Sequence, residues 1–178
     1  MGKRSEFKRV ERDFYPTPWK AVKPLISQLP KEFAFAEPCA GDGALVNHIE
    51  TLMEGGWCSW ASDIEPQNKG IINKHFRDLG EHEFLEADYI ITNPPWDRKL
   101  LHPMIEYFTA FRPTWLLFDA DWIHTKQSVE YLPLLKKIVS IGRVQWIPDS
   151  KSTGKDNCCW YLFDSANSQS IQFIGRKS

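Results

Sequence analysis

The sequence predicts an α/β protein with a seven-stranded, mostly parallel sheet and helices on both faces. Apolar runs of strand length occupy 33–36, 57–62, 89–91 and 114–119, and segments with helical spacing of apolar residues lie between them. A turn with two glycines, at 37–43, follows the first run. Strands that alternate with helices form right-handed βαβ units, which bring the carboxyl ends of the parallel strands to one edge of the sheet.

The other elements follow from apolar spacing and from glycine and proline punctuation. Pro18 opens a helix with Thr17 as its N-cap, and this helix ends at Pro30. The remaining predictions are a helix after Gly43, a polar helix at 66–75, a third strand at 76–79, a helix at 99–111, a helix at 128–139 that kinks at Pro133, strands at 144–147 and 158–163, and one further candidate strand at 171–174.

Length and composition indicate a single domain, 1–178. The hydrophobic fraction of 42% and the charged fraction of 25% are ordinary for a soluble globular protein. No apolar run approaches the length that spans a membrane, so no membrane association is expected. The net charge of −1 restricts any nucleic-acid footprint to a local patch.

The cysteines and histidines do not form a recognisable ligand set. Four cysteines contain no CxxC pair, and the five histidines lie apart. Cys158 and Cys159 would point to opposite faces of a strand, which disfavours shared metal ligation. We therefore expect no metal, no disulfides and a reducing, cytoplasmic setting in a bacterium or a phage-infected host.

The turn at 37–43, Glu-Pro-Cys-Ala-Gly-Asp-Gly, has the character of a nucleotide-binding loop. Gly41 and Gly43 let a ligand approach the backbone closely, and the N-terminus of the following helix adds partial positive charge. The loop matches neither the Walker phosphate loop nor GxGxxG. Its acidic side chains, Glu37 and Asp42, repel a pyrophosphate but suit a ligand with an ammonium or sulfonium charge, so NAD is disfavoured.

Two further acidic positions fit a nucleoside. Asp63 ends the second predicted strand, where a carboxylate can accept hydrogen bonds from both ribose hydroxyls. Ile64 can then lie against the face of an adenine, and Asp78 can accept a hydrogen bond from the adenine amino group. A surface Asp78 before the turn at Gly80 is the competing interpretation.

The segment 87–96 is the most informative stretch of the chain. A short buried strand stops at Asn93-Pro94-Pro95-Trp96, because the first proline denies the α region to Asn93 and the two prolines remove two backbone donors. The Asn93 side-chain oxygen and the Pro94 carbonyl can each accept one hydrogen of a planar aromatic amine, and Trp96 can stack on its ring. An isolated Asn-Pro-Pro is more often a plain turn, so this interpretation depends on the loop at 37–43.

In this order, the motifs Tyr15-Pro-Thr-Pro, Glu37-Pro-Cys-Ala-Gly-Asp-Gly, Asp63-Ile64, Asp78-Leu79 and Asn93-Pro-Pro-Trp resemble those of S-adenosylmethionine-dependent amino-methyltransferases. The resemblance is to the DNA N6-adenine methyltransferases in which the cofactor motifs precede the catalytic motif, including small phage-borne examples. It covers residues 13–96 strongly and the rest of the chain by strand order alone. It implies the Rossmann-like class I methyltransferase fold.

The resemblance also implies roles for particular residues. Asn93 and Pro94 would hold the target amine of an adenine flipped out of the DNA stack, Pro95 would line the shared pocket, and Trp96 would stack on the base. Transfer to the amine would need no metal ion. The residues implied to contact S-adenosylmethionine are Tyr15, Thr17, Glu37, Pro38, Cys39, Ala40, Gly41, Gly43, Asp63, Ile64, Asp78, Leu79, Asn93 and Pro95.

Members of that family with firm sequence specificity usually carry a sizeable target-recognition region, and this chain leaves no room for such a domain. A short or relaxed DNA target is therefore expected, as is dependence on a homodimer or an accessory partner. The candidate DNA contacts are basic or aromatic side chains of an N-terminal arm, 1–12, and of two loops: Lys3, Arg4, Lys8, Arg9, Trp122, His124, Lys126, Lys151 and Lys155.

Other functions are also compatible with these motifs. RNA methyltransferases and protein-glutamine methyltransferases use the same catalytic loop, because a carboxamide nitrogen is also a planar amine. The protein-glutamine enzymes usually have tyrosine after the prolines and an added helical domain. A catalytically silent module that binds nucleic acid or cofactor is a rival from a different class, and the intact Asn-Pro-Pro-Trp motif speaks against it. A Rossmann oxidoreductase is disfavoured by the acidic loop.

Overall fold

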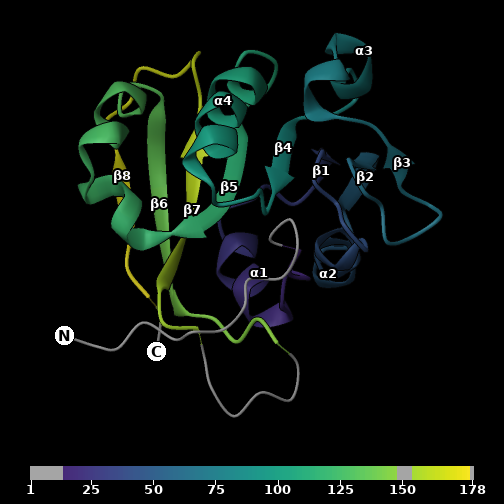
Figure 1. Cartoon of the computed structure of the whole chain (residues 1–178), viewed down its shortest axis with the longest axis horizontal. Coiled ribbons are helices and arrows are strands. Elements are labelled where there is room, and N and C mark those ends of the chain that lie inside the picture. The colour runs from purple at the N-terminus through teal and green to yellow at the C-terminus, as the bar shows by residue number, and fades with distance from the viewer. Residues whose placement is uncertain (1–13, 148–153, 177–178) are drawn as a thin grey trace.

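The computed structural model describes residues 14–147 and 154–176, which form an eight-stranded sheet with flanking helices (Figure 1). The strands are β1 (Phe33–Glu37), β2 (Gly56–Asp63), β3 (Ile72–Asn73), β4 (Tyr89–Thr92), β5 (Thr114–Asp119), β6 (Leu135–Arg143), β7 (Asn157–Phe163) and β8 (Gln172–Ile174). Their order is β3-β2-β1-β4-β5-β7-β6-β8, in which β7 pairs antiparallel with β5 and β6, and the other pairs are parallel. The mostly parallel sheet is confirmed, with eight strands where seven were expected.

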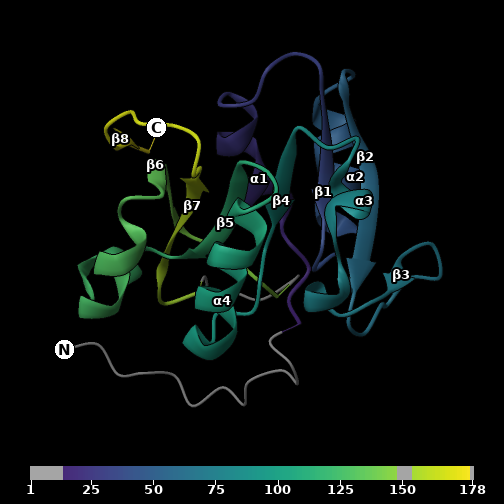
Figure 2. The same ribbon diagram turned by 90° about the horizontal axis from the view of Figure 1, so that it is seen from above.

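Helices cover both faces of the sheet, as predicted. The α-helices are α1 (Trp19–Ile26), α2 (Ala44–Leu52), α3 (Glu81–Phe84) and α4 (Arg98–Thr109), and the 3-10 helices are η2 (Phe76–Asp78), η3 (Ala120–His124) and η4 (Lys126–Tyr131). Figures 1 and 2 show α1 and α2 on one face and α4 on the other. Leu25 and Ile49 belong to the apolar cluster of the first face, and Ile105 and Phe108 to that of the second.

The central strands follow from their sequences. Every residue of β1 is buried, and β5 is buried from Thr114 to Phe118, as expected for strands with helices on both sides. The predicted N-cap of the first helix is wrong, however. Pro18 takes the N-cap position in an extended conformation and offers no side-chain hydrogen bond, whereas Thr17 is buried and faces the site described below.

The segment between β2 and α3 differs from the prediction. The polar stretch 66–75 is not a helix, because local side-chain bonds compete with helical ones: Asn68 Oδ1 accepts from the Gly70 backbone N–H at 3.0 Å. The third strand is β3, not 76–79, and it pairs with β2 through two residues only. Residues 76–78 instead form η2, with His75 as its N-cap.

The helix predicted at 128–139 and the strand predicted at 144–147 are both wrong. The chain forms η4 up to Tyr131, and after Pro133 it enters β6, which runs between β7 and β8. Ile138 and Val139 face opposite apolar clusters, so this strand is buried on both faces and lacks the alternation that identifies a strand in a sequence. Hydrogen bonding to two partner strands decides its conformation.

The last strands agree with the sequence. The prediction at 158–163 corresponds to β7, and the candidate strand at 171–174 corresponds to β8. Cys158 and Cys159 lie in opposite apolar clusters, as predicted for neighbours in a strand. In the part of the chain that the structure describes, all four cysteines are free, and no helix is both long and apolar enough to cross a membrane.

Candidate functional site

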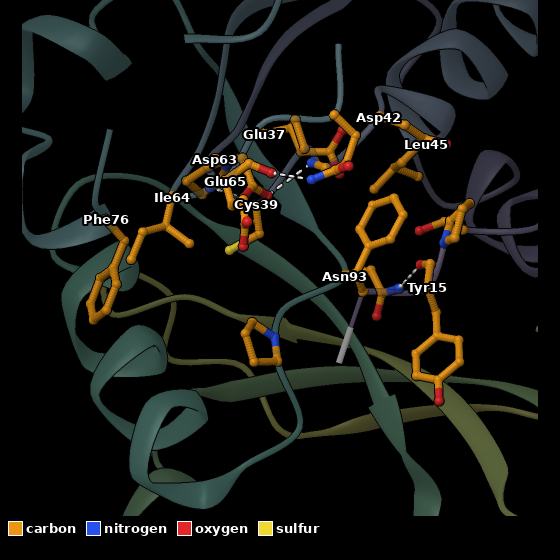
Figure 3. A pocket seen from close by; sticks show the side chains of 18 of the residues that line it. Tyr15, Glu37, Cys39, Asp42, Leu45, Asp63, Ile64, Glu65, Phe76 and Asn93 are labelled. Atoms are coloured by element: carbon orange, nitrogen blue, oxygen red, sulfur yellow. Dashed lines mark hydrogen bonds between the residues drawn. The ribbon is translucent and has the colours of Figure 1, made fainter. Parts of the chain in front are cut away.

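A cavity of about 300 Å³ lies at the carboxyl ends of β1, β2 and β4 (Figure 3). The parallel register pairs Ala36 of β1 with Ile90 of β4, so the turns after these two strands leave the sheet at the same edge. Carboxyl ends of parallel strands are the usual ligand-binding edge of such sheets. We call this space the larger cavity. The prediction that the Gly41 turn and the Asn93 turn share one edge is confirmed.

The Gly41 turn is shaped by glycine and held by Asp63. Gly41 and Gly43 have φ of +54° and +87°, a region that favours glycine. A Cβ at Gly41 would lie 2.6 Å from the ring of Phe14, so the absence of a side chain lets this ring pack closely on the Gly41 backbone. Asp63 Oδ2 accepts from the Gly41 N–H at 2.8 Å, and Asp63 Oδ1 accepts from the Glu65 N–H at 2.8 Å. The Asp63 carboxylate therefore joins the turns after β1 and β2.

Acidic side chains gather at the middle of the larger cavity. Glu37 is 1% exposed, and its Oε2 has no hydrogen-bond partner among the described residues. Burial raises the pKa of Glu37 well above its usual value, and the nearby Asp63 and Asp42 raise it further. Burial likewise raises the pKa of the Cys39 thiol, so this side chain is a neutral thiol in the cavity. A positively charged ligand group would relieve the acidic cluster.

One end of the larger cavity is mainly apolar. Ile64 and Phe76 lie at this end (Figure 3), the His75 ring packs on Phe76, and Leu100 and Met104 also line the cavity. In Figure 3, Phe76 lies beyond Ile64 as seen from Asp63. An apolar slot next to a carboxylate suits the base and ribose of a nucleoside.

The predicted contacts Asp78 and Leu79 do not line the larger cavity. Asp78 is exposed in η2, and Leu79 is 1% exposed in the apolar core. The reason is the 3-10 turn at 76–78, which takes the place of the predicted strand and directs His75 and Phe76 to the cavity instead. The competing interpretation of Asp78 as a surface residue is therefore the better one.

The turn after β4 separates the larger cavity from a second cavity of about 200 Å³, here called the smaller cavity. Tyr15 and Asn93 line both spaces. The remaining lining of the smaller cavity consists of Pro94, Trp96, Trp146, Gly154, Lys155 and Asp156. Its walls are thus largely aromatic and include one amide, one carboxylate and one ammonium group.

Hydrogen bonds orient Asn93 and Trp96. Asn93 Nδ2 donates to the Tyr15 carbonyl oxygen at 3.4 Å. Trp96 Nε1 donates to the Leu117 carbonyl at 3.2 Å and approaches Asn93 Oδ1 at 3.4 Å. Trp146 meets Trp96 edge to face, with ring centroids 5.6 Å apart. Besides the contact from Trp96 Nε1, Asn93 Oδ1 has a second lone pair, which can accept from a bound amine.

Most of the predicted cofactor contacts come together around the larger cavity. Those that line it are Tyr15, Thr17, Glu37, Pro38, Cys39, Ala40, Gly41, Asp63, Ile64, Asn93 and Pro95. Gly43 is not among them, and it serves as the N-cap of α2. Lining residues that were not predicted as contacts are Phe14, Pro16, Asp42, Leu45, Glu65, Gln67, His75, Phe76, Leu100 and Met104. Of these, Asp42 could have been predicted from the sequence, because it is an acidic residue within the turn at 37–43.

The predicted nucleic-acid contacts differ in their exposure to solvent. Trp122 is fully buried, packs against Phe118 and donates from Nε1 to His102 Nε2 at 3.0 Å, so its assignment as a DNA contact is wrong. His124 and Lys126 are exposed, and Lys155 is exposed at the smaller cavity. Lys3, Arg4, Lys8, Arg9 and Lys151 lie outside the described residues. Among the described residues, no group of three or more histidine, cysteine or acidic side chains is placed to hold a metal ion.

Comparisons with known proteins identify the fold. No family model matches the chain, and no curated protein sequence matches it. A structure from Pyrococcus horikoshii, described provisionally as an RNA methyltransferase, matches with a TM-score of 0.64 and 17% identity over 91% of this chain and 92% of the other. The modification subunit of a provisionally assigned type I restriction enzyme from Vibrio vulnificus matches with a TM-score of 0.58 and 12% identity, over 93% of this chain and 47% of that one.

A dimethyladenosine transferase from Plasmodium falciparum matches with a TM-score of 0.52 and 13% identity, over 87% of this chain and 64% of the other. This chain therefore spans about half the length of the restriction subunit and about two thirds of the transferase. At these identities the matches establish the fold alone. The chain has the Rossmann-like fold of class I methyltransferases.

Proposed function

We propose that this protein transfers a methyl group from S-adenosylmethionine to the exocyclic N6 amine of adenine in DNA, within a short or relaxed target sequence. One observation carries the proposal: Tyr15 and Asn93 line both the larger and the smaller cavity. A nucleoside cofactor in the larger cavity and a planar amine in the smaller one would therefore meet at Asn93.

The larger cavity fits S-adenosylmethionine in size and charge. Its volume of about 300 Å³ is at the lower end of ligand sites, which range over roughly 300–1,000 Å³. Glu37 Oε2 is buried without a hydrogen-bond partner in the described part of the chain, and Asp42 and Asp63 lie nearby, so the cavity favours a cation. Ile64 and Phe76 offer apolar surface for a purine. When bound, S-adenosylmethionine supplies an electrophilic methyl group on a sulfonium.

The smaller cavity fits an unstacked base. Trp96, Trp146 and Tyr15 provide aromatic surface, and stacking on aromatic rings is how proteins hold bases taken out of a helix. Trp146 was not predicted as part of the site, because the segment 144–147 had been assigned to a strand. The structure places it in the loop after β6, within ring contact of both Tyr15 and Trp96.

The chain's own residues would act by positioning and electrostatics. Asn93 Oδ1, and the Pro94 carbonyl next to it, would each accept one hydrogen of the target amine. These two bonds draw the nitrogen lone pair out of conjugation with the ring and direct it toward the larger cavity. The amine can release its surplus proton to solvent afterwards, so no strong general base is required. The apolar and aromatic walls restrict water at the meeting point.

The experiment that tests the proposal is transfer of tritium from labelled S-adenosylmethionine to separate pools of DNA, RNA and protein. We expect label in DNA, and N6-methyladenine after digestion of the DNA to nucleosides and mass spectrometry. Label in RNA or on protein glutamine without label in DNA would contradict DNA as the substrate and identify the labelled pool as the substrate instead. Absence of label in every pool, with intact protein, would favour a silent binding module. RNA belongs in the test because the Pyrococcus horikoshii match covers about nine tenths of both chains.

A further inference from the structure

His75 occupies the apolar end of the larger cavity, where Asp78 had been expected. Within the segment 73–79, the residues that line the cavity are His75 and Phe76. His75 lies in the connection between β3 and η2, and Phe76 is the first residue of η2. A half-buried imidazole at this place is a polar group without a role in the proposed transfer, and it lies beside the apolar slot for a base.

The backbone around His75 is held against the end of β2. The Lys74 N–H donates to the Asp63 carbonyl at 2.9 Å, and Asn73 Nδ2 donates to the Ile64 carbonyl at 2.7 Å. The His75 ring also packs on the Phe76 ring, with centroids 4.7 Å apart and planes inclined by 34°. These contacts come from both sides of His75, so its ring has a defined position relative to Asp63 and Ile64.

One ring nitrogen of His75 is already in use. Its Nδ1 accepts a hydrogen bond from the Arg77 backbone N–H at 3.2 Å. A nitrogen that accepts carries no hydrogen, so the neutral imidazole has its hydrogen on Nε2. The His75 side chain therefore offers a hydrogen-bond donor, whereas the predicted Asp78 carboxylate would have offered an acceptor.

We infer that His75 reads the base of the bound cofactor by donating from Nε2 to N1 of its adenine, an inference that rests on the proposed function. A nucleoside with its ribose at Asp63 and its base along Ile64 points the edge that carries N1 away from the ribose. That direction leads to Phe76, which lies beyond Ile64 in Figure 3 and is the chain neighbour of His75.

Recognition through N1 has a chemical consequence. In a 6-aminopurine N1 is an acceptor, but in a 6-oxopurine it carries a hydrogen. A donor at His75 therefore pairs with adenine and opposes hypoxanthine. A site that leaves two donors facing each other loses the hydrogen bond and keeps both groups desolvated, which is the strong form of discrimination.

Calorimetric titration of the full chain with S-adenosylhomocysteine and with its 6-oxo analogue, S-inosylhomocysteine, tests the inference. The wild type should prefer the adenine compound by more than about tenfold. His75→Ala should weaken binding of the adenine compound by roughly five- to tenfold and bring the preference close to one. His75→Gln should bind both compounds, because its amide can present either a donor or an acceptor.

His82→Ala is the matched control, since His82 is exposed on α3 and does not line the cavity. It should leave both affinities unchanged. A wild type that binds S-adenosylhomocysteine while His75→Ala and His75→Gln retain its preference would overturn the inference and leave the proposed function standing. A folded wild type that binds neither compound would instead overturn the proposed function, and this inference with it.

Discussion

The side chain of Asn93 donates a hydrogen bond to the main-chain carbonyl of Tyr15, 78 positions earlier in the sequence, at 3.4 Å (Figure 3). The bond ties the segment before α1 to the turn after β4, and both residues face both cavities. The other atom of the amide, Asn93 Oδ1, accepts from Trp96 Nε1 at 3.4 Å and has a second lone pair for a ligand.

Asn93→Ala should lower methyl transfer by roughly 10²–10³-fold, the usual effect of removing one well-placed polar group from a reaction centre. Binding of S-adenosylhomocysteine should stay close to normal, because the acidic and apolar groups of the larger cavity are retained. Single-turnover rates and calorimetry measure the two effects separately. Asn47→Ala, on the exposed side of α2, is the matched control and should change neither. Equal loss of binding and transfer would contradict the role given to Asn93.

Gly41→Ala should weaken cofactor binding and destabilise the turn. The residue has φ of +54°, which costs a non-glycine side chain about 1–2 kcal/mol, and the new Cβ would lie 2.6 Å from the Phe14 ring. Adding Phe14→Ala should relieve the steric part but not the backbone strain. Thermal melts with and without S-adenosylhomocysteine would show both. Gly70→Ala, where the nearest atom lies 3.6 Å away, should behave as wild type.

Glu37→Gln should raise the stability of the unliganded protein at neutral pH. Because burial raises the pKa of Glu37, the folded state holds this proton more tightly than the unfolded state, in which the pKa is about 4.3. The folded state therefore loses stability as the pH rises from that value through the raised pKa. The melting temperature of wild type should fall over this range relative to that of Glu37→Gln. Glu86→Gln, at an exposed position, should follow the wild-type profile.

The same variant should bind S-adenosylmethionine more weakly, since the ionised Glu37 offsets the charge of the cofactor. Its affinity should also lose the increase with pH that the wild type is expected to show over the range in which Glu37 ionises. Calorimetry in two buffers of different ionisation heat would detect the proton released on binding. An affinity independent of pH in the wild type would rule out this linkage.

Trp122→Ala should destabilise the protein by about 3–5 kcal/mol, the cost of truncating a large buried aromatic side chain. Trp122→Phe should cost less, since it mainly removes the hydrogen bond to His102. Urea titrations measure both. If either variant lost DNA affinity at unchanged stability, Trp122 would be a DNA contact after all.

Lys155→Ala should weaken DNA binding and lower the slope of log affinity against log salt by about one, as removal of one phosphate contact does. Its stability should not change, because the side chain is exposed at the rim of the smaller cavity. Lys31→Ala is the control, since Lys31 precedes β1 and so lies at the opposite edge of the sheet. Gel-shift titrations at several salt concentrations would compare the two. An unchanged slope in Lys155→Ala would show that Lys155 does not contact a DNA phosphate.

The N-terminal half of the site could be predicted from local sequence because its parts are local. An apolar run that ends in Glu-Pro-Cys-Ala-Gly-Asp-Gly or in Asn-Pro-Pro-Trp defines both the strand and the turn after it. Parallel pairing of two such strands then brings Gly41 and Asn93 to one edge, whatever the rest of the chain does. These relations need only backbone sterics and the handedness of the connections.

Long-range contacts decided the rest. The segment 135–143 contains an apolar pattern that suits either a helix or a doubly buried strand, and its pairing with β7 and β8 selects the strand. Trp122 looks like a loop residue in sequence and is buried only because β5, β7 and η4 close around it. His75 replaces Asp78 at the cavity because β3 has two residues and a 3-10 turn follows it. Such choices depend on which surfaces become buried against each other, and no local pattern carries that information.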